Sequence, residues 1–173
     1  MATRNIVTVG DSVLTKSCRQ VTAFDGHLGT LLDDMKETLL RSNGVGLAAP
    51  QVGVLRRAVL VLETNVPEGQ EEHVIELINP EIIECDGEQR GPEGCLSVPG
   101  KYGIVRRPMH VTVRAMDRNG RYFEAEGTGL TARAFCHEID HLDGILFTSL
   151  AERMLTDEEL ESGSYSDDAA EEN

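Results

Sequence analysis

Three features that this 173-residue sequence lacks limit the kinds of protein that it can encode. It contains no run of 18 apolar residues and no N-terminal charged segment followed by an apolar one, so we expect neither a membrane span nor a secretory leader. Its 16 basic residues are outnumbered by 30 acidic ones and form no cluster, which argues against a direct nucleic-acid site. The sequence therefore predicts a cytoplasmic protein with no membrane contact.

The cysteines include no C-x-x-C pair. The sequence has four of them, Cys18, Cys85, Cys95 and Cys136. In a cytoplasmic protein, cysteines with this spacing are expected to be free thiols or metal ligands rather than disulfides.

Composition indicates one folded domain followed by an acidic tail. Hydrophobic residues make up 40% of the chain, enough for a core that covers most of its length. The formal net charge is −14, and residues 156–173 contain eight acidic residues and no Lys or Arg. We expect the domain to occupy residues 1–150. The acidic C-terminal tail, residues 151–173, is expected to be partly helical and then disordered.

Apolar periodicity predicts two helices. Leucine and methionine recur at a 3.6-residue period over residues 28–39, where Asp25 can cap the helix and Asn43-Gly44 can end it. The same period predicts a second helix over residues 130–142, which Asp143-Gly144 ends.

Shorter apolar or alternating segments predict strands. They lie at residues 5–9, 58–63 and 74–83, and as two strands joined by a turn within 110–127. Pro80 is expected either to break the strand at 74–83 or to place it at a sheet edge. Strands followed by a late helix, without regular βαβ alternation, favour an α+β fold.

The segment FCHEIDHLDG, residues 135–144, places His137 and His141 four residues apart. On a helix these side chains would share one face, about 40° apart around the axis. Two such imidazoles can bind one metal ion with Glu138 beside it, a pattern typical of metallohydrolases. The alternative is a pair of hydrogen-bonded core histidines with an exposed glutamate. A catalytic metal site also needs a third ligand and an open position for water.

The segment PEGCLSVPG, residues 92–100, offers that third ligand. Cys95 lies between glycine- and proline-rich flanks, so its backbone is expected to be irregular or an edge strand. With two histidines, a Cys95 thiolate would leave one tetrahedral position open for water. The alternative is a small buried hydrophobic residue, which most free cysteines are.

The segment GVGLAAPQVG, residues 44–53, matches the dinucleotide-binding pattern G-x-G-x-x-A but lies in the wrong context. It follows a predicted helix, and Pro50 and Gly53 prevent a long helix after it. Its glycines instead allow the backbone to approach a ligand closely. Gln51 could donate a hydrogen bond to an oxyanion, or it could be an ordinary surface glutamine.

Together these three segments resemble the peptide deformylase family, over most of the chain as far as about Leu150. The motifs of that family, G-x-G-L-A-A-x-Q, E-G-C-L-S and H-E-x-x-H, occur here in the same order as GVGLAAPQ, EGCLS and HEIDH. The resemblance implies a metal-dependent hydrolase that removes the formyl group from the N-terminal formyl-methionine of newly synthesised polypeptides, by attack of metal-bound water on the formamide carbonyl. It also implies that residues 1–150 are the catalytic domain, an α+β fold with antiparallel sheets around a central HExxH helix and with an N-terminal amphipathic helix.

The resemblance further implies roles for individual residues. The expected metal ligands are Cys95, His137 and His141. They would bind one Fe2+ per chain, which Zn2+, Ni2+ or Co2+ can replace in purified protein. Glu138 would be the acid/base, and Gln51 with the backbone N–H of Leu96 would hold the oxyanion. The expected partners are N-formylmethionyl nascent peptides, at or near the ribosome.

A methionine-binding slot and a supporting set of charges complete the expected site. The slot is expected to be lined by Val45, Gly46, Leu130 and Ala134. For Leu130 and Ala134 the alternative is ordinary core packing. The charged residues expected to hold the cysteine segment against the helix are Glu93, Arg107 and Asp140.

Two other functions remain open at this point. A metal-dependent endopeptidase would use the same HEIDH arrangement but gives no role to EGCLS. A non-catalytic metal- or peptide-binding relative would be favoured by loss of the base or of the oxyanion donor, yet Glu138 and Gln51 are both present. Activity on formyl-Met-Ala-Ser against an internally blocked peptide distinguishes the three functions.

Overall fold

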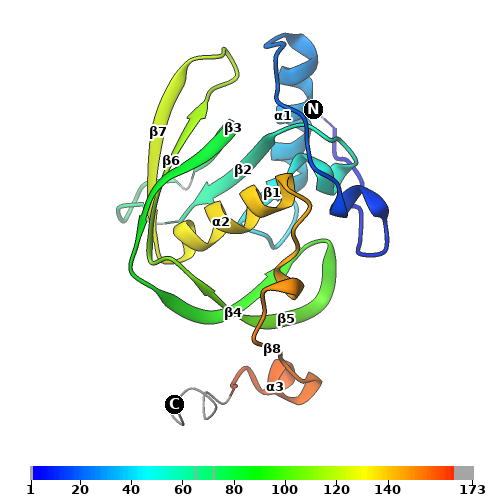
Figure 1. Ribbon diagram of the computed structural model, residues 1–173, viewed down its shortest axis with the longest axis vertical. Coiled ribbons are helices and arrows are strands. Elements are labelled where there is room, and N and C mark those ends of the chain that lie inside the picture. Colours follow the sequence, from blue (N-terminus) through cyan, green and yellow to red (C-terminus); the bar gives the residue numbers. More distant parts are fainter. Residues whose placement is uncertain (1, 65, 72, 166–173) are drawn as a thin grey trace.

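Two antiparallel sheets and two longer helices organise the chain in the computed structural model, which describes residues 2–64, 66–71 and 73–165 (Figure 1). The larger sheet has the strand order β1-β2-β3-β6-β7, with β1 Gly46–Ala48, β2 Ala58–Glu63, β3 His73–Asp86, β6 His110–Met116 and β7 Tyr122–Thr128. The smaller sheet has the order β4-β5-β8, with β4 Gln89–Cys95, β5 Val98–Arg107 and β8 Arg153–Met154. Short 3-10 turns lie at Ser12–Thr15, Ala49–Val52 and Phe147–Ser149. A mixed α/β fold with antiparallel sheets confirms the expected α+β class.

Helix α1, Gly26–Leu40, packs on one face of the larger sheet. It begins after Asp25, whose side chain accepts a hydrogen bond from the Leu28 N–H at 3.1 Å, as an N-cap does. The apolar part of its buried face, leucines and Met35, packs with strand residues such as Leu60 and Ile78, and Asp34 and Thr38 are buried as well. The helix ends before the predicted stop at residues 43–44. The N–H and the hydroxyl of Ser42 both bond to the Leu39 carbonyl there.

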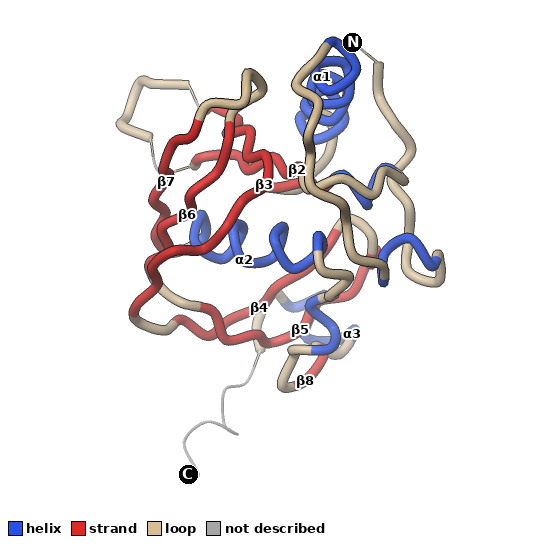
Figure 2. The backbone as a smooth tube through the Cα atoms, turned by 45° about the horizontal axis from the view of Figure 1, so that its top comes forward, coloured by secondary structure: helices blue, strands red, loops and turns tan. Residues whose placement is uncertain are grey.

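Helix α2, Leu130–Leu142, lies between the two sheets (Figure 2). Its side chains pack with β1, β2, β6 and β7 in one core that includes Val61, Val113 and Phe135. Almost every residue of the helix is buried, as expected for a helix covered on several sides. The HEIDH segment forms its last turns, where all its side chains are buried except that of Asp140, which is partly exposed.

Strand β3 continues through Pro80, contrary to the expected break. Its pairing with β2 ends at Ile78, and the pairing with β6 shifts register between Ile78 and Glu81. Asn79 adopts a φ of 50° there, and its amide exchanges two hydrogen bonds with the backbone of Val21. Pro80 thus sits at a bulge where no hydrogen bond to β2 is needed. Beyond it, β3 pairs with β6 alone, which agrees with the expected edge position.

Residues 5–9 do not form the predicted strand. Their backbone makes separate bonds to two distant segments: the Val7 N–H donates to the Gln51 carbonyl and the Val9 N–H to the Ser97 carbonyl, each at 2.7 Å. Because these acceptors belong to different segments, no ladder with a single strand can develop. The N-terminal segment instead joins the segments of Gln51 and Ser97.

The chain beyond residue 150 contributes to the smaller sheet. There β8 pairs with Gly103 and Ile104 of β5, and α3, Asp157–Ser162, begins with a capping box of Thr156 and Glu159. The predicted domain boundary at 150 stays a prediction. The tail was expected to be partly helical and then disordered, and its last residues, 166–173, lie outside the described residues, so the expected disorder stays a prediction. Among the helices that are described, none is long and apolar enough to cross a membrane.

Candidate metal centre

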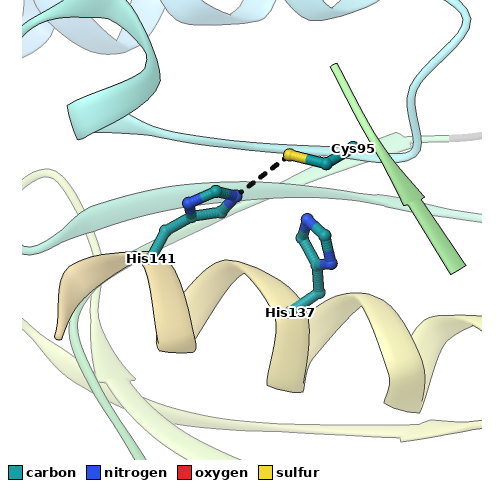
Figure 3. A group of neighbouring side chains, drawn as sticks. All are labelled: Cys95, His137 and His141. Atoms are coloured by element: carbon teal, nitrogen blue, oxygen red, sulfur yellow. Dashed lines mark hydrogen bonds between the residues drawn. The ribbon is translucent and has the colours of Figure 1, made fainter. Parts of the chain in front are cut away.

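The side chains of Cys95, His137 and His141 converge on one point between β4 and α2 (Figure 3). One ligand atom from each lies within 4.8 Å of the others. The Cys95 Sγ is 3.3 Å from the His141 Nε2, and the two imidazole centroids are 5.0 Å apart. In Figure 3 both rings rise from the same side of α2 toward the sulfur. This is the donor set of a tetrahedral site with one open position.

Local backbone geometry explains why these three side chains meet. The histidines are one helical turn apart on α2, so they project from the same face. Cys95 ends β4, and the pairing of β4 with β5 shifts register between Gly94 and Cys95. Such a shift changes the direction of the side chain that follows it, here that of Cys95. As the sequence allowed, β4 is an edge strand of its sheet.

A buried ion cluster fixes the orientation of His137. The Glu93 carboxylate lies 2.7 Å from its Nδ1, so the other ring nitrogen faces Cys95. Arg107 binds Glu93 through two nitrogens at 3.0 and 2.7 Å and Asp140 through a third at 2.7 Å. Arg133 adds a bond to Glu93 at 2.9 Å. Burial disfavours the charged carboxylate, but the bonds from His137 and Arg107 lower the pKa of Glu93 to about 2.

The electrostatics around the histidines suit a bound cation. Burial and the neighbouring His137 lower the pKa of His141 to about 3, so this ring is in the neutral form that binds metals. Burial opposes charge on His137 as well. Even so, the negative charge of Glu138 and the bonds to Cys95 and Glu93 raise the pKa of His137 well above its usual value. The negative groups around His137 thus favour positive charge at that ring, which a bound cation could supply in place of the proton.

A buried carboxylate oxygen also fits a site for water or substrate. Among the described residues, the Glu138 Oε1 is buried without a hydrogen-bond partner. Buried polar atoms are normally satisfied, and an exception can mark a place where a water or ion binds. Beside the three converging donors, this oxygen fits a metal ion with water or substrate next to it.

Glu138 points into the same space without being one of the three donors. Its carboxylate lies against the backbone of Gly46, where a Cβ would overlap it. Burial raises the pKa of Glu138 to about 7, although the positive charge of His137 opposes that rise. A carboxylate with a pKa near 7 can both accept and donate a proton at neutral pH. Its burial rules out the alternative of an exposed glutamate.

Gln51 is buried beside the sulfur, which rules out an ordinary surface glutamine. Its Oε1 accepts a hydrogen bond from the Ala48 N–H at 2.9 Å. The Nε2 end is therefore turned the other way, 3.1 Å from the Ser97 Oγ and 3.5 Å from the Cys95 Sγ. Gln51 thus presents a donor to the centre.

A cavity of about 210 Å³ opens beside the centre, and Cys95 and His137 are among the residues that line it. Its lining includes every residue expected in the methionine slot, together with the backbone-donor candidate: Val45, Gly46, Leu96, Leu130 and Ala134. Leu130 is 50% exposed, so it lies at the rim and is not an ordinary core residue. Ala134 belongs to the core cluster and also lines the cavity.

Three residues of the site were not assigned a role from sequence. Ser97 is part of EGCLS, but nothing in the sequence shows that its hydroxyl faces Gln51. Arg133 precedes His137 by one helical turn, a spacing that places both on one face and could have identified it. Tyr102, which is half exposed and lines the cavity, lies on β5, a strand that the pattern did not predict.

Known proteins are similar in sequence to most of this chain. A family model described as polypeptide deformylase matches residues 3–156. A peptide deformylase from Lachnoclostridium phytofermentans is 57% identical over 150 residues, which are 85% of this chain and 88% of the relative. One from Caldanaerobacter subterraneus subsp. tengcongensis is 53% identical over 161 residues, covering 93% and 97% of the two chains.

Solved structures agree with the sequence comparisons. The peptide deformylase of Thermotoga maritima superposes with a TM-score of 0.79 at 37% identity, covering 88% of this chain and 99% of that one. A Met-Ala-Ser-bound structure of the Acinetobacter baumannii enzyme gives 0.79 at 36% identity, covering 86% and 98%. The chain therefore belongs to the polypeptide deformylase family, hydrolases that remove the formyl group from the N-terminal methionine of new polypeptides.

Proposed function

We propose that deformylation takes place at the Cys95–His137–His141 centre. The observation that carries this proposal is the convergence of these three donors, within 4.8 Å of one another, beside a buried carboxylate and a cavity. One His-Cys-His set with an open position is the arrangement of a catalytic rather than a structural metal site.

The ion that we propose for the cell is ferrous iron, one per chain. Cys95, His137 and His141 would hold it, and Zn2+, Ni2+ or Co2+ could replace it in purified protein, because imidazole and thiolate bind all of these ions. When bound, the ion supplies Lewis acidity, which makes water a usable nucleophile near neutral pH.

Glu138 would move the protons of the reaction. It accepts a proton from the attacking water, whose oxygen forms a new bond to the formyl carbon. The bond between that carbon and the methionine nitrogen then breaks, and the same carboxyl delivers a proton to the departing amine. Formate and a free N-terminal methionine result. The burial that raises the pKa of Glu138 to about 7 suits both transfers.

Gln51 and the backbone N–H of Leu96 are proposed as donors to the oxygen of the formyl group. That oxygen gains negative charge as water adds to the carbonyl. A fixed donor in a site that excludes water contributes about 2.7–4 kcal/mol to stabilisation of such a transition state. The orientation of the Gln51 amide, with nitrogen toward the centre, supports this role.

The substrate side chain is proposed to enter the adjacent cavity. Its lining by Val45, Gly46, Leu130 and Ala134 combines apolar walls with an open rim, as a methionine slot requires. The related Acinetobacter baumannii enzyme has been solved with Met-Ala-Ser bound, which supports this placement. We further propose that the chain acts in the cytoplasm on nascent peptides, at or near the ribosome.

The test is release of formate from formyl-Met-Ala-Ser by metal-loaded protein. We expect turnover of this peptide and none of an internally matched peptide whose N-terminus is acetylated, since cleavage inside the chain would indicate an endopeptidase. Cys95→Ser should lose most of its metal and nearly all activity, because a neutral hydroxyl replaces thiolate poorly. Cys85→Ser, at an exposed cysteine, is the matched control. One ion per chain in Cys95→Ser, measured by mass spectrometry, would refute the ligand set.

A further inference from the structure

We infer that Ser97 is a positioning residue that holds the Gln51 amide in its catalytic orientation. This inference rests on the proposed role of Gln51 as a donor to the substrate oxygen. Ser97 is fully buried and follows Cys95 by two residues. Its hydroxyl contacts the amide of Gln51 and not the ligand atoms, so it would act through that amide.

Hydrogen bonds at both ends fix the Gln51 side chain. A carboxamide has an acceptor oxygen and an NH₂ group with two donor hydrogens. The oxygen is used by the Ala48 N–H at 2.9 Å, and the NH₂ group donates to the Ser97 Oγ at 3.1 Å. The same NH₂ group also donates to the Cys95 Sγ at 3.5 Å, so its second hydrogen is turned toward the metal centre. The bond to Ser97 fixes the first N–H and thereby keeps the second on the side of the centre, where a substrate oxygen could accept from it.

The backbones of Gln51 and Ser97 are held together independently of these side chains. The N–H groups of Val7 and Val9 donate to the carbonyls of Gln51 and Ser97, each at 2.7 Å. A single extended segment thus joins the two residues through its own backbone. Removal of the Ser97 hydroxyl should therefore leave the two backbones in register and release only the amide.

Ser97 has a second contact that a side-chain substitution leaves intact. Its backbone N–H donates to the Cys95 Sγ at 3.4 Å, and alanine at this position retains that N–H. Ser97→Ala consequently separates an effect on Gln51 from an effect on the thiolate. In the cobalt-loaded protein, the sulfur-to-metal charge-transfer absorption should be unchanged in Ser97→Ala.

The kinetic test is a double-mutant cycle on formyl-Met-Ala-Ser with Ser97→Ala, Gln51→Ala and the double variant. Loss of one oxyanion donor costs about 10²–10³ in kcat, and we expect Gln51→Ala to show a loss of that order. Loss of its orientation should cost less, on the order of tenfold in kcat for Ser97→Ala, with KM changed by less than about twofold. In the Gln51→Ala background, Ser97→Ala should have no further effect, because residues that act through one another are not additive.

Ser149→Ala is the matched control, because it removes an exposed hydroxyl whose hydrogen bond, to the Leu146 carbonyl at 2.8 Å, does not involve Gln51. It should leave kcat unchanged. An equal loss in kcat from Ser97→Ala with and without Gln51 would overturn the inference, as would wild-type kcat in Ser97→Ala.

A measurement without turnover separates this inference from the proposed function. In the ¹H–¹⁵N correlation spectrum of metal-loaded protein, the Gln51 amide hydrogen that donates to Ser97 should be shifted from its position in a free carboxamide and should exchange slowly with solvent. In Ser97→Ala both properties should be lost, and in Ser149→Ala they should persist. An amide unchanged in Ser97→Ala refutes the positioning role even in active protein. Absence of formate release by the wild-type chain refutes the proposed function instead.

Discussion

At the scale of single residues, the buried position of Glu138 determines the pKa of its side chain. The carboxylate is buried at the end of the cavity, one of its oxygens lacks a hydrogen-bond partner among the described residues, and burial raises its pKa to about 7. A glutamate in water would be ionised at neutral pH, and it would be too weak a base to take a proton from water efficiently. The motif HEIDH indicated which residue to consider, but its pKa follows from burial that only the fold provides.

We expect Glu138→Gln to keep its metal and lose its turnover, because the amide preserves the shape but cannot move a proton. The loss in kcat should be about 10²–10⁴-fold, the range of positioned acid-base groups. Metal content and binding of a chelating hydroxamate peptide should remain at wild-type levels. A variant that retained more than about a tenth of wild-type kcat would show that another group is the base.

Gly46 is predicted to be needed for the position of that carboxylate. A Cβ at Gly46 would overlap Glu138, so Gly46→Ala should displace the carboxylate and lower kcat by on the order of tenfold or more, as small misplacements of catalytic groups do. Gly26→Ala is the matched control, since a Cβ there meets nothing within 4 Å. Steady-state kinetics of both variants decides the point. Equal kcat values would show that the site adapts to a methyl group.

At the scale of secondary-structure elements, Arg107 connects three of them. From β5 it binds Glu93 on β4 and Asp140 on α2, and Glu93 in turn orients His137. The cluster therefore sets the distance between the strand that carries the cysteine and the helix that carries the histidines. The sequence suggested this set of charges. It could not show that Glu93 also reaches the histidine ring.

Arg107→Met should destabilise the protein and weaken metal binding together. Removing one partner of a buried ion cluster leaves uncompensated charge and costs about 3–5 kcal/mol, which denaturant unfolding can measure. Arg106→Met, at the preceding position of β5, removes an exposed guanidinium that binds Glu88 and Glu152. Its effect on the free energy of unfolding should be much smaller. If the two variants unfolded at the same denaturant concentration, the cluster would not hold these elements together.

The helices and strands that were predictable from sequence are those in which apolar residues recur with a regular period. Helix α2 was predictable because its apolar residues follow a single period and its end carries Asp143-Gly144. Strands β4 and β5 were not, since glycines and prolines interrupt any alternation in residues 91–103. The strand predicted at 5–9 failed for a different reason. Its two hydrogen-bonded valines find partners in segments more than 40 residues apart in the sequence, which no local pattern encodes.

At the scale of the whole molecule, a metal ion at the proposed centre would join the two sheets. Cys95 belongs to the smaller sheet, whereas the histidines lie on the helix that packs against the larger one. Removal of the ion should therefore lower the stability of the whole fold. A free metal concentration of 100 times the dissociation constant stabilises the native state by about 2.7 kcal/mol. For a chain of this size, that stabilisation raises the Tm by roughly 5–10 °C. Calorimetry of stripped and reloaded protein tests this, and Cys95→Ser should show no such difference. An equal Tm with and without metal would contradict it.

The identity of the ion is the final property predicted for the intact molecule. Ferrous iron binds nitrogen and sulfur ligands more weakly than nickel or zinc. If iron is the ion in the cell, as proposed, its occupancy would depend on its availability, and it should be lost or replaced during purification. Iron and the thiolate of Cys95 are both oxidisable. We therefore expect the iron form to be fast but inactivated by air, a nickel or cobalt form to be stable and nearly as fast, and a zinc form to be stable and slow. The protein would be stripped, reloaded anaerobically with each ion, and assayed for deformylation before and after exposure to air. Equal rates for zinc and iron, or an iron form indifferent to oxygen, would show that iron is not the ion for which this Cys-His-His centre is suited.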